Sequence, residues 1–274
     1  MAGKRSQRFL CILNIIFLFA YLMVCLTPFL RSGSFWFIAA AGLVFPFLLL
    51  ALIVLLIIAL IRRSRPLILL NIAVLFLGIQ QILAVFAFHL PQKTEDTRPD
   101  GCLRVLSWNV NRWVEGNQQQ QGQQGFRKMM MDMVQLQDAD VLCFQEFFES
   151  YDPLMAESSA GLLKKMGYPY SYFFPSSKIY EKKYQFGVSI FSRYPLTDSG
   201  QFITTDHPHS EGYCYVDLKW EGQPLRIFTT HLESFGIRNV EQEAGSGLGG
   251  RLKYSYELRN YQASLLGEAV RQSP

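Results

Sequence analysis

The chain has 274 residues, of which 50% are hydrophobic and 18% are charged, and its formal net charge is +4. Residues 1–90 contain seven of the 26 basic residues and none of the 22 acidic ones, so the rest of the chain has 19 basic and 22 acidic residues and a net charge of −3. The positive charge therefore belongs to the apolar first third, and a general electrostatic attraction of the remainder to nucleic acid is excluded.

Three long stretches within residues 1–90 are almost free of charge: Phe9–Leu30, Phe35–Ile61 and Leu67–Leu90. At 1.5 Å per residue, each is long enough to cross a hydrocarbon core of roughly 30 Å. We therefore predict a membrane anchor of three transmembrane helices over residues 1–90, in contact with the lipid bilayer through residues 9–90. The alternative for the first stretch is a cleaved signal peptide, but the stretch is long for that role and no Ala-x-Ala site follows it.

The basic residues of this segment predict its topology. Six of the seven lie before the first stretch or between the second and third: Lys4, Arg5, Arg8, Arg62, Arg63 and Arg65. By the positive-inside bias, the N-terminus faces the cytoplasm, and three crossings place everything after residue 90 outside the inner (cytoplasmic) membrane. Asn71, Gln80 and Gln81 of the third stretch are expected to face the other helices. A transport role is the alternative, but the stretches contain no acid or base pair, which favours an anchor.

Residues 91–101 are polar and charged, as in a linker between domains, and residues 102–274 are predicted to form a single domain. Apolar runs and turn residues predict its strands at Leu103–Ser107, Asp140–Gln145, Phe186–Ser192, Tyr213–Trp220 and Leu225–Thr230. Helical spacing predicts helices at Phe126–Gln137, Pro153–Met166 and Arg251–Arg271. The glutamine-rich segment Glu115–Gly125 is expected to be a loop, and the aromatic run from Tyr168 to Phe174 a strand with core residues. Strands outnumber helices and meet mostly through turns, which favours an α+β fold over a doubly wound sheet.

Cysteines in the second part of the chain are three in number and widely spaced: Cys102, Cys143 and Cys214. This pattern predicts neither a disulfide framework nor a metal-binding knuckle. Cys143 lies inside an apolar run and is expected to be a small core residue.

Polar clusters follow four of the apolar runs, at Ser107–Asn111, Phe144–Glu146, Gly187–Pro195 and Thr229–Ser234. Glu146 ends a buried strand, where a carboxylate needs either a salt bridge or a bound cation, and the residue alone does not decide between them. Asn109 by itself is typical of a turn. His231 by itself is typical of a structural histidine.

The order of these clusters and the residues within them indicate a protein family more specifically than any single residue does. "LRVLSWNVN", "ADVLCFQE", "GVSIFSRYPL" and "RIFTTHLES" together resemble the endonuclease/exonuclease/phosphatase superfamily, from about Leu103 to the end of the chain. The preceding apolar stretches look like those of its membrane-anchored bacterial members. The resemblance implies a two-sheet β-sandwich flanked by helices (four-layer αββα). It also implies an Mg²⁺-dependent phosphoester hydrolase (phosphodiesterase, nuclease or phosphatase), in which water attacks a metal-bound phosphate.

The same resemblance assigns roles to individual residues. Glu146 is expected to be the principal metal ligand, for Mg²⁺ or alternatively Mn²⁺. Asn109 is expected to hold the metal and phosphate shell, and His231 to donate a hydrogen bond to the scissile phosphate. Ser192 and Arg193 match the third cluster and are expected to be mainly structural.

The implied substrate is a phosphoester: nucleic acid, a phospholipid head group or a sugar phosphate. No nucleotide cofactor is expected, because the glycine pattern Gly245–Gly250 is not preceded directly by a strand.

The chain also departs from the superfamily pattern. An Asp-x-Asn cluster and a C-terminal Ser-Asp-His cluster are missing, and His207 and His209, in a loop-like run, are not expected to replace them. The domain is therefore expected to be C-terminally incomplete, and this 274-residue form to have little or no activity. The alternative to an anchored enzyme is a catalytically inactive truncated module or a fragment of a longer protein.

Overall fold

The structure is a computed structural model that describes residues 2–30, 35–86, 101–114, 124–151, 157–176, 183–204, 212–233 and 247–273. Its contacts divide the chain into two units, residues 1–94 with 234–260, and residues 95–233 with 261–274. The C-terminal helix α8 (Leu248–Arg271) contributes residues to both units. Several segments named above lie outside the described residues: 91–100 of the linker, 115–123 of the glutamine-rich segment, His207, His209, and 245–246 of the glycine pattern.

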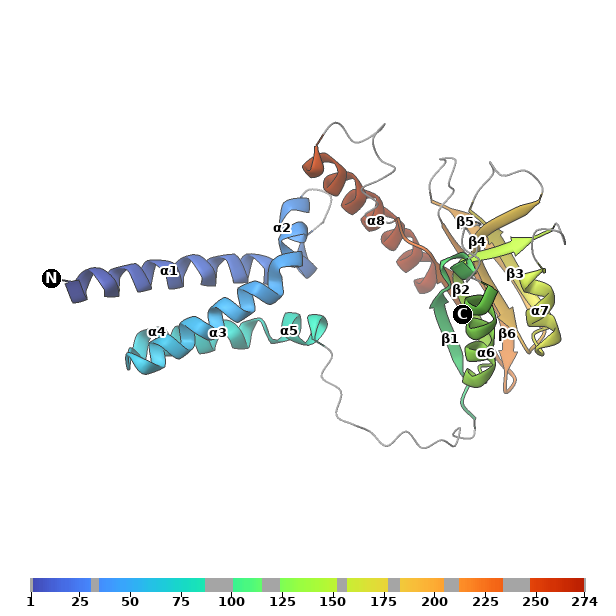
Figure 1. The fold of residues 1–274 in the computed structure, drawn as a ribbon, viewed down its shortest axis with the longest axis horizontal. Coiled ribbons are helices and arrows are strands. Elements are labelled where there is room, and N and C mark those ends of the chain that lie inside the picture. Colours follow the sequence, from blue (N-terminus) through green and yellow to red (C-terminus); the bar gives the residue numbers. More distant parts are fainter. Residues whose placement is uncertain are drawn as a thin grey trace. The chain divides into compact units, whose positions relative to one another are not determined.

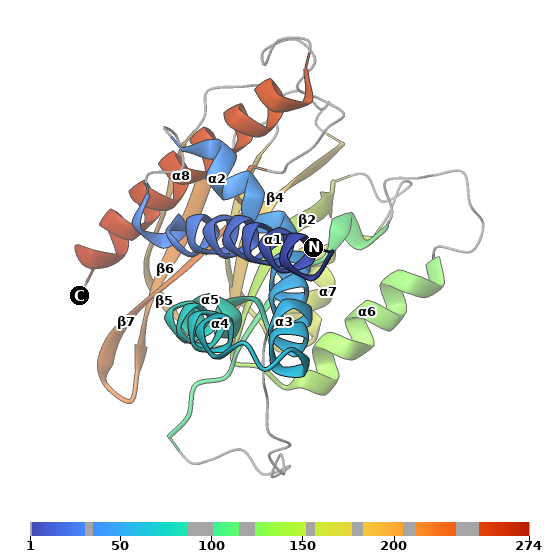
Figure 2. The same ribbon diagram turned by 90° about the vertical axis from the view of Figure 1, so that its left-hand side faces the viewer.

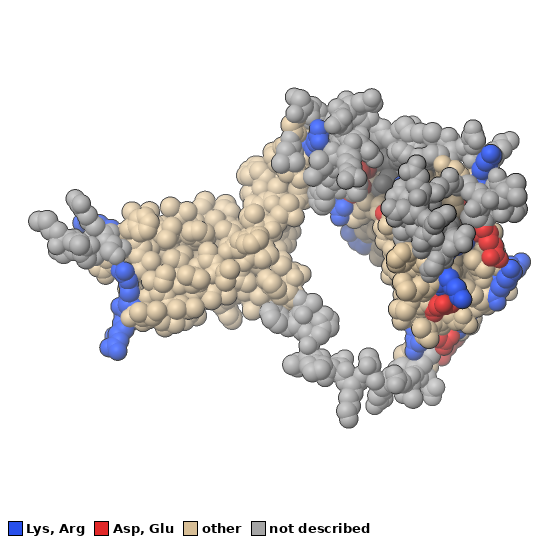
Figure 3. Space-filling view, viewed as in Figure 1, with Lys and Arg blue, Asp and Glu red and all other residues tan. Residues whose placement is uncertain are grey.

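Apolar helices make up the N-terminal part of the first unit. They are α1 (Ala2–Cys25), α2 (Trp36–Ala41), α3 (Phe45–Ile61), α4 (Arg65–Leu77) and α5 (Ile79–Val85). Buried side chains of α1, α3 and α4 form one core cluster, which includes Tyr21, Phe45 and Leu52. Most other large apolar side chains of these helices are exposed. In Figure 3 this surface shows no Asp or Glu, and Lys and Arg gather at one end, a pattern that suits contact with lipid.

The predicted count of three continuous transmembrane helices is wrong. Among the described residues, two helices are long and apolar enough to cross a membrane, Gln7–Phe29 and Trp36–Ile61. The third apolar stretch is divided at Gly78 into α4 and α5, whose axes are bent by 57° relative to each other. The two helices count as a third span only if they cross the membrane together as one bent segment. The Tyr21 ring occupies the space that a side chain at Gly78 would fill. The break therefore lies where a glycine lets a neighbouring helix approach the backbone closely.

A polar contact joins α1 to α4. Asn71 Nδ2 donates to Asn14 Oδ1 at 3.0 Å and to Leu67 O at 2.8 Å, and both asparagine side chains are fully buried. The prediction that Asn71 faces the other helices is confirmed, whereas Gln80 is exposed. Polar pairs of this kind hold apolar helices in one register, because a buried amide that loses its partner on the other helix leaves a polar group without a hydrogen bond.

Two β-sheets form the centre of the second unit (Figures 1 and 2). The first sheet has the order β1-β2-β4-β3, with β1 (Val105–Asn109) parallel to β2 (Val141–Ser150). In this sheet β4 (Tyr184–Ser192) pairs antiparallel with both β2 and β3 (Tyr170–Pro175). The second sheet is antiparallel, in the order β5 (Leu196–Ile203), β6 (Gly212–Trp220), β7 (Gln223–Thr230).

Strand β2 separates two hydrophobic clusters. Val141 and Cys143 pack with residues of both sheets, including Val216 of β6. Leu142 and Phe144 point to the other face, where they pack with residues of α6 (Gln124–Gln137) and α7 (Ser159–Lys165). Since side chains alternate along a strand, β2 is buried on both faces, as its continuous apolar run predicts.

Most of the predicted elements of this unit are present, some with ends shifted by two or three residues, and three larger differences remain. Of the helix predicted over Pro153–Met166, residues 153–156 lie outside the described residues, and α7 begins at Ser159, where the Ser158 hydroxyl accepts the Gly161 N–H at 2.9 Å and caps the helix. Strand β2 continues to Ser150, five residues beyond its predicted end. Strand β5 was not predicted, because it is an edge strand with exposed polar residues and no clear apolar alternation.

Candidate active site

Glu146 lies at an irregularity of β2. Phe144 pairs with Ser189 of β4. The next registered pair is Phe147 with Gly187, so β2 contains one extra residue at this point, as in a β-bulge. Glu146 has a φ of 51°, in the left-handed region that side-chain-bearing residues rarely adopt. Such a conformation costs about 1 to 3 kcal/mol and is typical of functional sites, where the surrounding structure holds it in place.

Asn109 reaches this carboxylate from the neighbouring strand. It is the last residue of β1 and pairs with Gln145 in the parallel ladder. Its Nδ2 donates to Glu146 Oε1 at 2.9 Å, and its Oδ1 accepts the Asn111 N–H at 2.9 Å. The Asn109 amide is thus oriented at both ends, and it fixes one oxygen of Glu146.

His231 approaches the same oxygen from the second sheet. It follows β7 directly, and its Nε2 lies 3.8 Å from Glu146 Oε1, longer than a hydrogen bond. The two side chains are 28% and 30% exposed, so a ligand can reach both from solvent. The structure therefore brings together the three residues that the sequence nominated, Asn109, Glu146 and His231.

Gln145 links the two sheets beside this cluster. Its Nε2 donates to Thr229 Oγ1 on β7 at 2.8 Å and lies 3.3 Å from Ser107 Oγ on β1. Thr229 is buried and lies two residues before His231. The Gln145 side chain therefore holds the end of β7 against β1 and β2, and the position of His231 depends on this link.

The third sequence cluster has structural contacts. Arg193 Nη1 pairs with Asp138 Oδ1 at 2.7 Å, and its guanidinium carbon lies 5.1 Å from the centroid of the Tyr168 ring. Ser192 Oγ accepts the Tyr194 N–H at 2.9 Å. These contacts agree with the structural role predicted for Ser192 and Arg193.

A strained turn follows β1, and the sequence did not reveal it. Asn111, Arg112 and Trp113 have φ values of 45°, 54° and 54°, three successive left-handed residues without a glycine. Trp113 is fully buried and packs against Phe144. The buried indole anchors the turn and thereby sets the direction of the preceding side chain.

Arg112 is the side chain that this turn directs toward β4. Its guanidinium carbon lies 4.1 Å from the ring centroid of Phe186, on β4. Since β2 lies between β1 and β4, Arg112 reaches over β2, and Phe186 pairs with Phe148, two residues beyond Glu146. The ion pairs of the described residues do not include Arg112. No sequence pattern singles out this arginine, because its position depends on the strand order.

Two protein-family models match the chain. Residues 106–250, more than half of the chain, match the model of the Endonuclease/Exonuclease/phosphatase family, and residues 7–85 match a domain of unknown function (DUF8431). No curated protein matches the chain.

Similar solved structures include sphingomyelinase C from Streptomyces griseocarneus, with 21% identity, a TM-score of 0.45, and coverage of 63% of this chain and 60% of that one. A variant of beta toxin from Staphylococcus aureus with bound magnesium ions has 21% identity, a TM-score of 0.44, and coverage of 63% and 60%. An endonuclease/exonuclease/phosphatase family protein from Leptotrichia buccalis has 18% identity, a TM-score of 0.39, and coverage of 50% and 57%. The chain thus spans less than two thirds of the length of each.

Proposed function

Because the chain belongs to the endonuclease/exonuclease/phosphatase family, we propose that it hydrolyses phosphoesters at the cluster of Asn109, Glu146 and His231. The observation that carries this proposal is their convergence from three strands, with Glu146 Oε1 2.9 Å from Asn109 Nδ2 and 3.8 Å from His231 Nε2. A carboxylate to hold a cation, an amide to orient it and an imidazole to contact a phosphoryl oxygen are the groups that metal-assisted hydrolysis requires.

Glu146 is the proposed ligand of Mg²⁺, with Mn²⁺ as the alternative, and Asn109 completes the shell around it. Among the described residues, no three His, Cys, Asp or Glu side chains are grouped closely enough to hold a metal ion by themselves. This donor set fits Mg²⁺, which binds through one or two carboxylates, several waters and phosphate oxygens. It does not fit a structural zinc site, which needs four protein ligands. When bound, Mg²⁺ neutralises the charge that develops on the phosphoryl group.

The other residues of the site bind and orient the substrate. His231 donates an N–H to a phosphoryl oxygen, and Gln145 keeps that histidine at the site through its bond to β7. Arg112 presents its guanidinium edge to the phosphate, while Phe186 stacks on the guanidinium face and limits its motion. Each contact strengthens as negative charge gathers on the phosphoryl oxygens, which is the requirement for lowering the barrier.

The proposed setting is the outer side of the inner (cytoplasmic) membrane, and it requires that the bent pair of α4 and α5 crosses the bilayer as a third span. Residues 1–90 are the proposed anchor with a cytoplasmic N-terminus, residues 91–101 the linker, and residues 102–274 the αββα hydrolase domain. The two apolar helices support the anchor. An anchored domain of net charge −3 is held near lipid and has no general attraction to nucleic acid. We therefore place a phospholipid head group ahead of nucleic acid and sugar phosphate as the substrate.

The test uses the full chain in lipid nanodiscs and has two readouts, hydrolysis of bis(p-nitrophenyl) phosphate with and without EDTA, and Mn²⁺ binding measured by electron paramagnetic resonance. Glu146→Gln keeps the shape of the side chain and removes its charge. Mn²⁺ binding is the deciding readout, because little or no turnover is expected of this chain. Glu146→Gln is expected to weaken Mn²⁺ binding more than about tenfold, since losing even an outer-shell partner costs that much, and to abolish any EDTA-sensitive turnover.

Glu221→Gln is the matched control, because Glu221 also has a left-handed backbone (φ 48°) but lies in the β6–β7 turn. It is expected to change neither readout. Retention of Mn²⁺ binding and turnover by Glu146→Gln contradicts the assignment of the metal site.

A further inference from the structure

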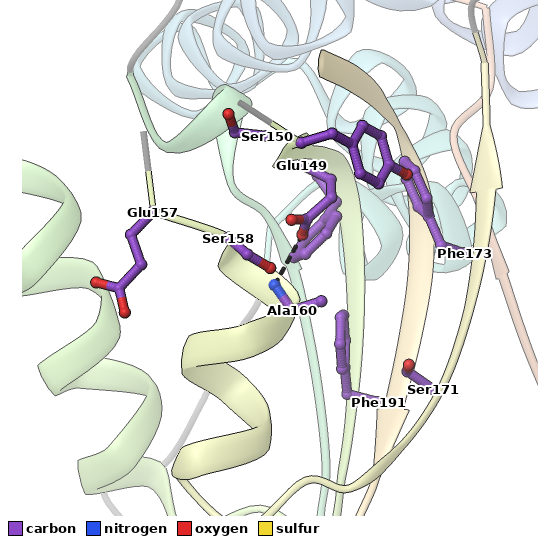
Figure 4. Close-up of a pocket in the computed structure, with 10 residues that line it drawn as sticks. Glu149, Ser150, Glu157, Ser158, Ala160, Ser171, Phe173 and Phe191 are labelled. Carbon is purple, nitrogen blue, oxygen red and sulfur yellow. Dashed lines mark hydrogen bonds between the residues drawn. The ribbon is translucent and has the colours of Figure 1, made fainter. Parts of the chain in front are cut away.

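A pocket of about 590 Å³ lies beside β2, lined by residues of β2, β3, β4 and the start of α7 (Figure 4). Three phenylalanines form its apolar walls, Phe147, Phe173 and Phe191. The ring centroid of Phe147 lies 5.6 Å from that of Phe173 and 5.1 Å from that of Phe191. This volume and this lining are typical of sites for small organic molecules. The pocket lining does not include Asn109, Glu146 or His231, so it is distinct from the proposed active site.

Glu149 brings a buried carboxylate to this pocket. The residue is 5% exposed, and Figure 4 shows its carboxylate bonded to the start of α7, where Oε2 accepts the Ala160 N–H at 2.8 Å. The ion pairs of the described residues do not include Glu149. Burial of an ionised carboxylate with a single hydrogen bond is unfavourable, and a cation beside it relieves that cost.

The rest of the lining is also suited to a positive charge. Glu157 adds a second carboxylate, which is exposed and pairs with Lys165 at 3.0 Å. The described lining residues include no Lys, Arg or His. The nearby Arg127 is engaged by the Glu157 carbonyl and the Ser159 hydroxyl. Burial, and then the negative charge of Glu149, raise the pKa of Tyr151 at the rim.

We propose that this pocket binds a small organic cation, an ammonium group on an apolar body. The ammonium group donates to Glu149, and the apolar body packs against Phe147 and Phe191, whose ring faces also attract a cation. Three features select this ligand class together: a buried carboxylate, aromatic walls, and no basic side chain among the described lining residues. An anion is repelled, and a neutral molecule leaves the carboxylate without a counter-charge.

The test measures binding of three probes of similar size by calorimetry: phenethylammonium, neutral 2-phenylethanol and anionic phenylacetate. The full chain in nanodiscs is used, and empty nanodiscs correct for partition into lipid. Phenethylammonium is expected to bind most tightly and phenylacetate most weakly. Failure of phenethylammonium to bind, or tighter binding of phenylacetate, overturns the proposal.

Two variants locate the binding to Glu149. Glu149→Gln keeps an acceptor for the Ala160 N–H, and is expected to weaken phenethylammonium binding about tenfold or more while leaving 2-phenylethanol unchanged. Glu157→Gln is the matched control, expected to change binding less than about twofold because that carboxylate is exposed and already paired. Equal effects of the two variants contradict the role of Glu149.

A third variant tests the pocket without touching a charge. Ala160→Leu adds apolar volume to the lining and is expected to weaken phenethylammonium and 2-phenylethanol alike. If both probes bind this variant as they bind the unaltered chain, the pocket is not their site.

Discussion

Replacing Glu146 by glycine is expected to stabilise the domain relative to alanine while removing the proposed metal ligand. The φ of 51° at this position costs a side-chain-bearing residue about 1–2 kcal/mol, and glycine avoids that cost. At an ordinary strand position, glycine is instead less stable than alanine by roughly 0.5–1 kcal/mol, because it loses more backbone freedom on folding. The two terms oppose each other here, and the difference favours glycine by about 0.5–1 kcal/mol.

The comparison of Glu146→Gly with Glu146→Ala isolates this backbone term, because both variants lose the carboxylate and its bond from Asn109. Thermal unfolding of the full chain in nanodiscs should show the glycine variant melting about 1–4 °C higher than the alanine variant. The same pair at Glu221, with its φ of 48°, is expected to show the same order without any change in Mn²⁺ binding. Equal melting of the two Glu146 variants, or higher melting of the alanine one, refutes the claim that the bulge stores strain for function.

Three further outcomes are expected elsewhere in the chain. Asn14→Leu and Asn71→Leu should each lower the free energy of unfolding of the apolar helices by about 1 kcal/mol, measured by unfolding in SDS. The double variant should lose less than the sum of the two, and additive losses would show that the two side chains are not coupled. Gln145→Leu should lower the free energy of unfolding by about 1–2 kcal/mol through loss of the bond between the sheets, and an unchanged melting temperature contradicts this. Burial raises the pKa of the Cys143 thiol to about 12, so the reactive thiolate is rare at pH 8. Iodoacetamide should therefore label the exposed Cys102 before Cys143, and rapid labelling of Cys143 in the folded protein refutes its burial.

Local patterns were enough to predict the parts of the molecule that depend on near neighbours in the chain. Uncharged apolar stretches predicted helices whose exposed side chains are apolar. The continuous apolar run that ends at Gln145 predicted a strand buried on both faces. Polar residues at the ends of the runs nominated Asn109, Glu146 and His231, which the structure brings together. The close approach of Asn109 and Glu146 follows from ladder pairing, since Asn109 lies beside Gln145 in the parallel pair of β1 and β2.

Only the tertiary structure decided how those parts meet. The extra residue in β2, which turns Glu146 toward Asn109 and His231, exists only relative to the register of β4. Arg112 crosses β2 because of the strand order, and the helix break at Gly78 depends on Tyr21. Each of these features is a relation between residues far apart in the chain, whereas periodicity and polarity report only on the environment of one segment. For that reason the chemical groups of the site could be predicted from the sequence, whereas their geometry depends on long-range packing.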